Sequence, residues 1–217
     1  MGKVRTKVVF HPYHYSVDKN FIQRLIDWGV PLGLFYLYFQ FYNFGKITPS
    51  EMVKTTGLMA ISLLALTLLA GPVARFLPFL DILKAHRKFW GITSFLFLAA
   101  HVLLVYIFYF KFNIYKFVDP SNPKALGLIT GLLATGILLL VTLTSSKKAL
   151  KGLDPKTWKV IQTTSYLALI LAVAHFYLME QVNGALAVKR FFGQITFYFA
   201  TAVIVVRLIV LFLPKRQ

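Results

Sequence analysis

The stretch FWGITSFLFLAAHVLLVYIFYF, residues 89–110, decides the fold of this chain. It contains no Asp, Glu, Lys or Arg, and it exceeds the ~18–20 apolar residues that a helix needs to cross the ~30 Å hydrocarbon core of a membrane. The sequence therefore predicts a transmembrane helix here. One imidazole, that of His101, lies inside it, and an ionisable group within a membrane usually marks a function.

Five further apolar runs lie on either side of this stretch. Together they predict an all-α fold, an integral membrane bundle of six transmembrane helices that forms a single domain over residues 1–217. We expect the second span to end at Gly71-Pro72, because proline cannot continue the hydrogen bonding of a helix. The expected spans are Trp28–Phe44, Thr56–Ala70, Phe89–Phe110, Leu126–Thr144, Val160–Leu178 and Phe191–Leu213.

The composition excludes several classes of protein. Hydrophobic residues make up 58% of the 217 residues and charged residues only 14%, whereas a soluble domain carries about a quarter charged residues. There is no cysteine, so the chain has no disulfide, thiolate ligand or iron–sulfur cluster of its own. Residues 1–20 are basic and polar and lack the apolar core of a signal peptide.

The net charge of +17 comes from basic residues between the apolar runs. This placement indicates contact with membrane lipid, and it argues against nucleic-acid binding. Sixteen Lys and Arg residues fall on one predicted side and seven on the other, and Arg207 lies inside the last span. The positive-inside rule then predicts a multi-pass protein of the inner or plasma membrane with both termini in the cytoplasm.

The histidines point to the chemistry. His11 and His14 lie in the polar N-terminal arm and His86 in a basic loop, whereas His101 and His175 lie inside apolar spans. His101 is 14 residues beyond Arg87 and His175 is 15 residues beyond Val160. At 1.5 Å per residue these spacings place both imidazoles about 21–22 Å from the cytoplasmic side. The two spans run the same way, so the imidazoles reach nearly equal depth in the outer half.

Two imidazoles at matched depth can bind one haem iron from its two faces. We expect small residues to make room for the ring, with Ala168 and Ala172 on the face of His175 and with Gly91 and Ser94 below His101. The alternative is that each histidine bonds a polar group on a neighbouring helix and so joins the bundle.

Three segments resemble the ferric-reductase-like transmembrane family, and most closely its MsrQ-type branch. They are LLALTLLAGPVARFL (63–77), HRKFWGITSFLFLAAH (86–101) and TLTSSKKALKGLDPKTWKVIQTTSYLALILAVAHFY (142–177). The resemblance covers about residues 55–178. Positions that match or lie near the family pattern are Pro72, Arg75, Arg87, Lys88, Gly91, Phe95, His101, Thr144, Ser145, Trp158, Tyr166 and His175.

The resemblance implies a b-type cytochrome, a haem-carrying membrane subunit with Arg87 and Gly91 near the cofactor. In the MsrQ-type branch the partner is a bacterial periplasmic methionine sulfoxide reductase. In the wider family the acceptors are ferric iron and oxygen. A flavin mononucleotide near the cytoplasmic face is also suggested by the resemblance, without a residue to place it. Gln162 stands where the family has a further histidine, so we expect a single haem, held by His101 and His175. His86 is the alternative ligand for a second haem.

The sequence thus predicts an electron-transfer subunit of an oxidoreductase system. It would accept electrons on the cytoplasmic side from a flavin, reductase or quinol and pass them to an acceptor on the outer side. No Gly-rich nucleotide fingerprint is present. A membrane transporter is disfavoured because no span carries a central Asp or Glu. A non-catalytic assembly subunit remains a third interpretation.

Overall fold

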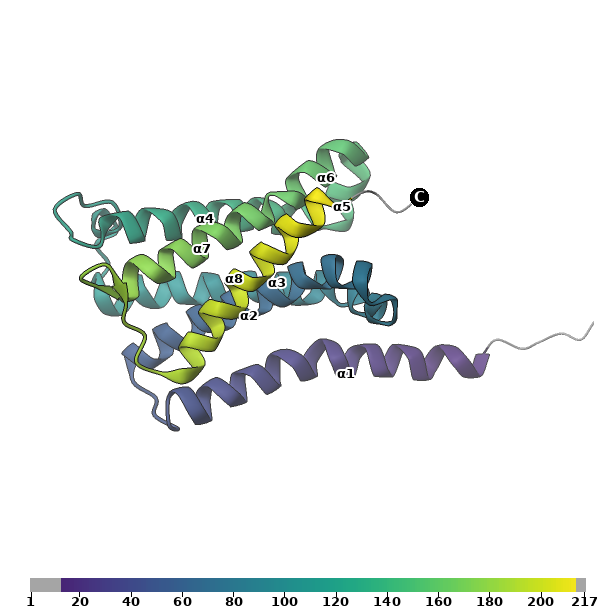
Figure 1. The fold of residues 1–217 in the computed structure, drawn as a ribbon, viewed down its shortest axis with the longest axis horizontal. Coiled ribbons are helices and arrows are strands. Elements are labelled where there is room, and N and C mark those ends of the chain that lie inside the picture. Colours follow the sequence, from purple (N-terminus) through teal and green to yellow (C-terminus); the bar gives the residue numbers. More distant parts are fainter. Residues whose placement is uncertain (1–12, 214–217) are drawn as a thin grey trace, which may run out of the picture.

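The computed structural model describes residues 13–213, and these fold as a bundle of long helices (Figure 1). The only strands among them are two of two residues each. The elements in chain order are α1 (Tyr13–Leu37), η1 (Tyr38–Tyr42), α2 (Pro49–Phe76), η2 (Pro78–Ala85), α3 (Arg87–Leu104), η3 (Val105–Tyr109), η4 (Ile114–Phe117), α4 (Ala125–Thr144), α5 (Lys147–Gly152), α6 (Pro155–Thr163), α7 (Ser165–Glu180), β1 (Gln181–Val182), β2 (Ala185–Leu186) and α8 (Phe191–Phe212).

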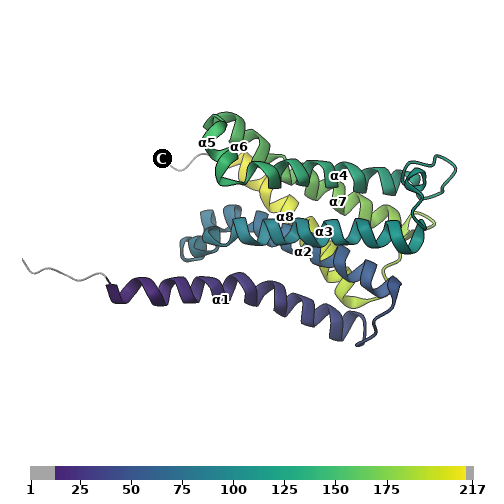
Figure 2. The same cartoon turned by 180° about the vertical axis from the view of Figure 1, so that it is seen from behind.

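Five helical segments within the described residues are long and apolar enough to cross a membrane. They are Pro49–Phe76, Arg87–Tyr109, Ala125–Thr144, Pro155–Glu180 and Phe191–Phe212. These segments confirm an all-α, multi-pass membrane bundle. The predicted first span lies in α1 and η1, which run alongside the bundle (Figures 1 and 2). Charged groups such as Asp27 lower the hydropathy of α1, and the count of six spans stays a prediction.

Helix α2 is the centre of the bundle. Its most apolar window is 72% buried, whereas the corresponding windows of the other four segments are 6–22% buried. The main core lies where α2, α4, α7 and α8 meet. Its buried residues are Ile61, Leu64, Ala65, Leu68, Leu138, Ala168, Leu169, Ala200 and Val203. The outer faces of the surrounding helices are apolar, as contact with lipid requires.

The prediction that the second span ends at Gly71-Pro72 is wrong. Helix α2 continues through Pro72 to Phe76. Proline lacks an N–H, so the carbonyl of Leu68, four residues earlier, loses its partner in the helix. The Tyr166 hydroxyl on α7 donates to that carbonyl at 2.9 Å. A side chain from a neighbouring helix thus satisfies the carbonyl that proline leaves free, as happens in membrane helices.

The fifth predicted span consists of two helices, α6 and α7, and Thr164 lies between them as an interruption. Asp154 caps the start of α6, where its carboxylate accepts hydrogen bonds from the backbone N–H groups of Lys156 and Thr157. Hydrogen bonds with Thr157, first that of its side chain and then that of its backbone N–H, lower the pKa of the Asp154 carboxyl. Gln162 lies on α6, two residues before this interruption, and His175 lies on α7.

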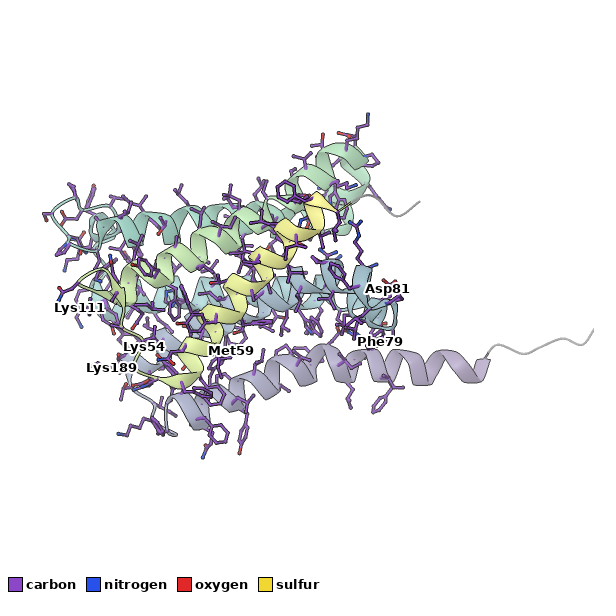
Figure 3. The ribbon with its side chains drawn as sticks, viewed as in Figure 1. Lys54, Met59, Phe79, Asp81, Lys111 and Lys189 are labelled. Carbon is purple, nitrogen blue, oxygen red and sulfur yellow. The ribbon has the colours of Figure 1, made fainter. Side chains whose placement is uncertain are left out.

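The loops of the bundle gather at its two ends. Lys54, Lys111 and Lys189 lie near one end, and Phe79 and Asp81 of η2 lie near the other (Figure 3). Helix α1 begins, and helix α8 ends, at the same end as η2 (Figure 1). This arrangement agrees with the predicted alternation of the spans. Which end faces the cytoplasm stays a prediction. We call the end with Lys54 the outer end and the end with η2 the cytoplasmic end, following that prediction.

Candidate functional site

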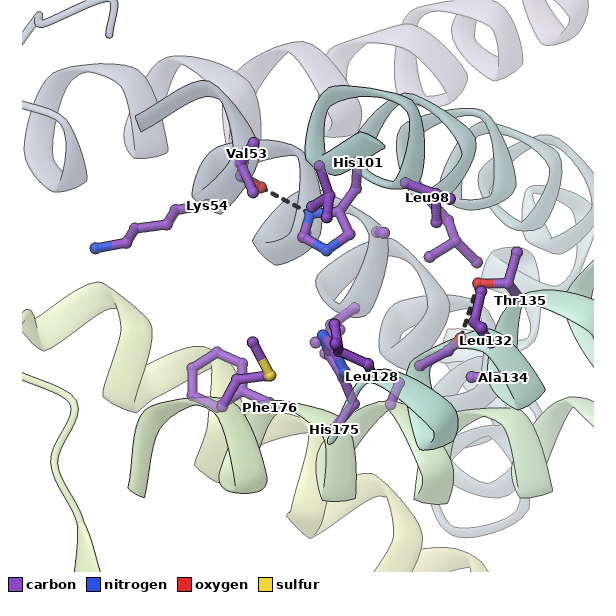
Figure 4. A pocket seen from close by; sticks show the side chains of 18 of the residues that line it. Val53, Lys54, Leu98, His101, Leu128, Leu132, Ala134, Thr135, His175 and Phe176 are labelled. Carbon is purple, nitrogen blue, oxygen red and sulfur yellow. Dashed lines mark hydrogen bonds between the residues drawn. The ribbon is translucent and has the colours of Figure 1, made fainter. Parts of the chain in front are cut away.

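Two histidines from different helices face each other inside the bundle. His101 lies on α3 and His175 on α7. The centroids of their rings are 6.2 Å apart, and the ring planes are nearly perpendicular, at 85°. Figure 4 shows one ring nitrogen of His101 on the side that is turned toward His175. The structure therefore brings together the two imidazoles that the sequence places at equal depth.

A backbone carbonyl holds each imidazole in place. The Nδ1 atom of His101 lies 2.8 Å from the carbonyl oxygen of Val53 on α2, and Nδ1 of His175 lies 2.7 Å from that of Gly127 on α4. A carbonyl can only accept, so each Nδ1 carries the proton and donates it, and each neutral ring keeps a lone pair on Nε2. Metal-binding histidines are oriented by hydrogen bonds of this kind.

These bonds are also what the alternative interpretation predicts, namely histidines that join neighbouring helices. That interpretation accounts for one nitrogen of each ring. It gives no reason for the two rings to face each other. The facing arrangement is therefore the feature that separates the two interpretations.

Two glycines provide the space that the imidazoles occupy. A Cβ atom at Gly131 on α4 would lie 2.7 Å from Nδ1 and 3.0 Å from Cε1 of His175. At Gly57 on α2 it would lie 3.0 Å from Nδ1 of His101. Sequence reasoning missed both glycines because it considered small residues on the helices that carry the histidines. The signal was present as glycines inside the neighbouring apolar spans.

A cavity of about 370 Å³ contains both histidines. This volume is in the range of small-molecule sites, about 300–1,000 Å³. Side chains of α2, α3, α4 and α7 line the cavity, and most of the lining is apolar (Figure 4). Lining residues close to the histidines include Leu98, Leu128, Leu132, Ala172 and Phe176. The cavity also reaches the loops of the outer end, where Tyr109, Asn122 and Lys124 line it.

The other predicted site residues lie in different places. Ala172 lines the cavity, whereas Ala168 is fully buried in the main core. A Cβ at Gly91 would meet Thr67 of α2 at 3.5 Å, so this glycine serves the packing of α3 against α2. The Nε atom of Arg87 donates to the Thr67 carbonyl at 3.1 Å. Neither Gly91 nor Arg87 lines the cavity.

His86, the alternative ligand, lies at the start of α3 and does not line the cavity. Its side chain is almost fully buried, and its Nδ1 lies 2.7 Å from Oδ1 of Asp27 on α1. The imidazole also stacks on the Trp90 ring, with centroids 5.3 Å apart. His86 thus connects α1 to α3. His11, and the side chain of His14, lie outside the part of the chain that the structure describes.

Gln162, which stands in place of the family histidine, joins α6 to α4. Its amide nitrogen lies 3.1 Å from the Val141 carbonyl and 3.2 Å from the hydroxyl oxygens of Thr144 and Ser145. It does not line the cavity. An unbroken helix would turn Gln162 and His175 to different faces. In the structure both side chains nevertheless bond to α4.

The donor set fits a haem. Among the side chains that the structure describes, no group of three or more His, Asp or Glu could hold a bare metal ion. A haem needs only two axial ligands, because the porphyrin supplies the rest. A histidine nitrogen binds a metal ion at about 2 Å, so two rings on one ion have centroids about 6 Å apart. The observed 6.2 Å agrees with that spacing.

The fold and the site define a multi-pass membrane protein with a paired-histidine cavity. Residues 56–173, more than half of the chain, match the family described as ferric reductase like transmembrane component. The chain therefore belongs to that family. The match runs from α2 into α7 and includes His101, and it ends two residues before His175. No curated protein matches the chain.

Proposed function

We propose that this protein is a b-type cytochrome subunit that relays electrons through one haem, held by His101 and His175. The observation that carries the proposal is the facing pair of imidazoles, each oriented through Nδ1 by a backbone carbonyl. Membership in a ferric-reductase-like family supports a redox role in the membrane. Bound haem would supply one-electron chemistry, because its iron cycles between the ferric and ferrous states.

The chain's own contribution is to orient the ligands and to surround them with a mostly apolar lining. The Val53 and Gly127 carbonyls fix the tautomers, so that Nε2 of each ring would be the atom available to bind the iron. Gly57 and Gly131 let α2 and α4 approach the rings closely. The mostly apolar lining around the histidines lowers the polarity of the site, which is one of the means by which a protein tunes a haem.

The location of the cavity supports transfer toward the outer side. The cavity extends to the loops of the outer end, including Asn122 and Lys124. Electrons would arrive from a cytoplasmic-side donor such as a flavin, a reductase or a quinol. If the chain belongs to the MsrQ-type branch, the acceptor is a periplasmic methionine sulfoxide reductase. The wider family would make ferric iron or oxygen the acceptor, and a flavin mononucleotide remains part of this proposal.

Purification and reconstitution test this function. The purified protein should show a haem Soret band that shifts to longer wavelength on reduction, when a sharp α band should also appear. In vesicles, the reduced protein should be reoxidised by an impermeant oxidant that contacts the outer end. A transporter or an assembly subunit requires no such band. A preparation that incorporates no haem, even when haem is supplied during expression, would overturn the proposal.

A further inference from the structure

One face of α2 runs along the whole cavity. Lys54, Gly57, Ile61 and Leu64 line the cavity at helical spacing, because residues three and four apart lie on one face of a helix. Gly57 contacts His101, and Lys54 lies three residues nearer the outer end. Figure 4 shows the Lys54 side chain extended away from the imidazoles, on the side opposite Leu98 and Thr135.

Two ammonium groups lie at this end of the cavity. Lys54 and Lys124 are the cationic side chains among the described residues that line it. Both are half-buried. The ammonium of Lys124 donates to the carbonyls of Leu178 and Gln181, at 2.9 and 3.1 Å, and an ammonium has a third donor. The ammonium of Lys54 makes no hydrogen bond or ion pair to a described residue.

The acidic groups nearby leave this end with a net positive charge. Glu180 lines the cavity and is the one carboxylate among its described lining residues. Glu51 lies close enough for its charge to interact with Lys54, but both of its oxygens bond to the guanidinium of Arg190. The cavity therefore presents two cations against one carboxylate at its outer end, while its remaining lining is mostly apolar.

The two histidines leave one property of the cofactor undetermined. His101 and His175 would hold the iron, but they would not decide which way the edge of the porphyrin points. Haem carries two carboxylate side chains on one edge, and an unpaired carboxylate in an apolar site is costly. The orientation is therefore set by where the cavity offers cations.

We propose that Lys54, assisted by Lys124, binds the haem carboxylates, so that the carboxylate edge of the ring faces the outer end. This inference rests on the proposed function. The apolar edge then lies among Leu98, Leu132 and Ala172, deeper in the bundle. Charge-assisted hydrogen bonds of this kind are about twice as strong as neutral ones. They make Lys54 an orienting residue as well as a binding residue.

The test compares haem with its dimethyl ester, in which both carboxylates are neutral. The apoprotein in detergent is titrated with each compound, and the low-spin spectrum reports binding to the histidines. The wild type should bind haem at least about tenfold more tightly than the ester, since a hydrogen bond to a charged group is lost. The variant Lys54→Met should lose most of this preference, whereas Lys54→Arg should retain it. Lys46→Met is the control, because Lys46 is exposed at the same end and does not line the cavity.

The outcomes separate the two proposals. If Lys54→Met and the wild type prefer haem over the ester equally, the assignment of Lys54 is overturned while the cytochrome function stands. If Lys46→Met loses the preference as fully as Lys54→Met, the effect comes from general surface charge, and the assignment again fails. If the wild type gives a low-spin spectrum with neither compound, the proposed function itself fails.

Discussion

Replacing Gly131 by alanine tests the geometry of the site more selectively than removing a histidine. In Gly131→Ala the new Cβ would lie 2.7 Å from Nδ1 of His175, closer than real contacts allow. The nearest atoms belong to the imidazole itself, so the ring must move away from the position in which it donates to Gly127. The variant keeps both histidines and disturbs only the orientation of one.

The expected loss follows from the size of the clash. Forcing an extra methyl group into a packed site costs about 1–3 kcal/mol. If that strain falls on the bound state, haem affinity drops about 5- to 150-fold. Gly57→Ala should show a smaller loss, because its Cβ would lie 3.0 Å from His101. Haem titration of the apoprotein measures both effects.

Gly136→Ala is the matched control. Gly136 lies on the same helix, α4, and its Cβ would meet nothing within 4 Å. This substitution should leave haem affinity unchanged. Circular dichroism and gel filtration in detergent should show all three variants folded. Equal haem affinity in Gly131→Ala and Gly136→Ala would refute the assignment of His175 as an oriented ligand.

Three further predictions concern the rest of the bundle. Tyr166→Phe removes the hydroxyl that satisfies the Leu68 carbonyl freed by Pro72. It should destabilise the protein by about 1–3 kcal/mol, as measured by thermal unfolding in detergent. The control Tyr198→Phe, at an exposed position, should have no effect. His86→Ala and Gln162→Ala should each lower stability but leave the haem spectrum unchanged, since neither side chain lines the cavity. Loss of a second haem in His86→Ala would contradict the expectation of one haem per chain. A reporter that works only in the cytoplasm should be active when fused after residue 217. Activity of a reporter that works only outside the cytoplasm would show that the orientation is the reverse.

The pairing of the histidines could be predicted because helix rise is constant. Fourteen and fifteen residues from the same side give equal depths for His101 and His175, whatever the lateral arrangement of the helices. The structure places the two rings 6.2 Å apart. Hydropathy likewise locates five of the predicted spans, since the membrane requires apolar runs of that length.

The partners of the histidines could not be predicted in this way. In a membrane the lipid is as apolar as the helix, so the apolar pattern does not reveal which face of a helix meets its neighbours. The folded chain was therefore needed to show which groups contact the imidazoles. These groups are Gly57, Gly131 and the carbonyls of Val53 and Gly127. The carbonyl that Pro72 leaves free in α2 is satisfied by Tyr166, a residue far away in the sequence.

The haem content and spin state of single histidine variants test the central claim most directly. Pyridine haemochrome and protein assays of the wild type should give one haem per chain with a six-coordinate, low-spin spectrum. In His101→Ala and in His175→Ala, the remaining haem should be high-spin or absent, because each change removes one axial ligand. A full complement of low-spin haem in both variants would contradict the assignment of this cavity as the haem site.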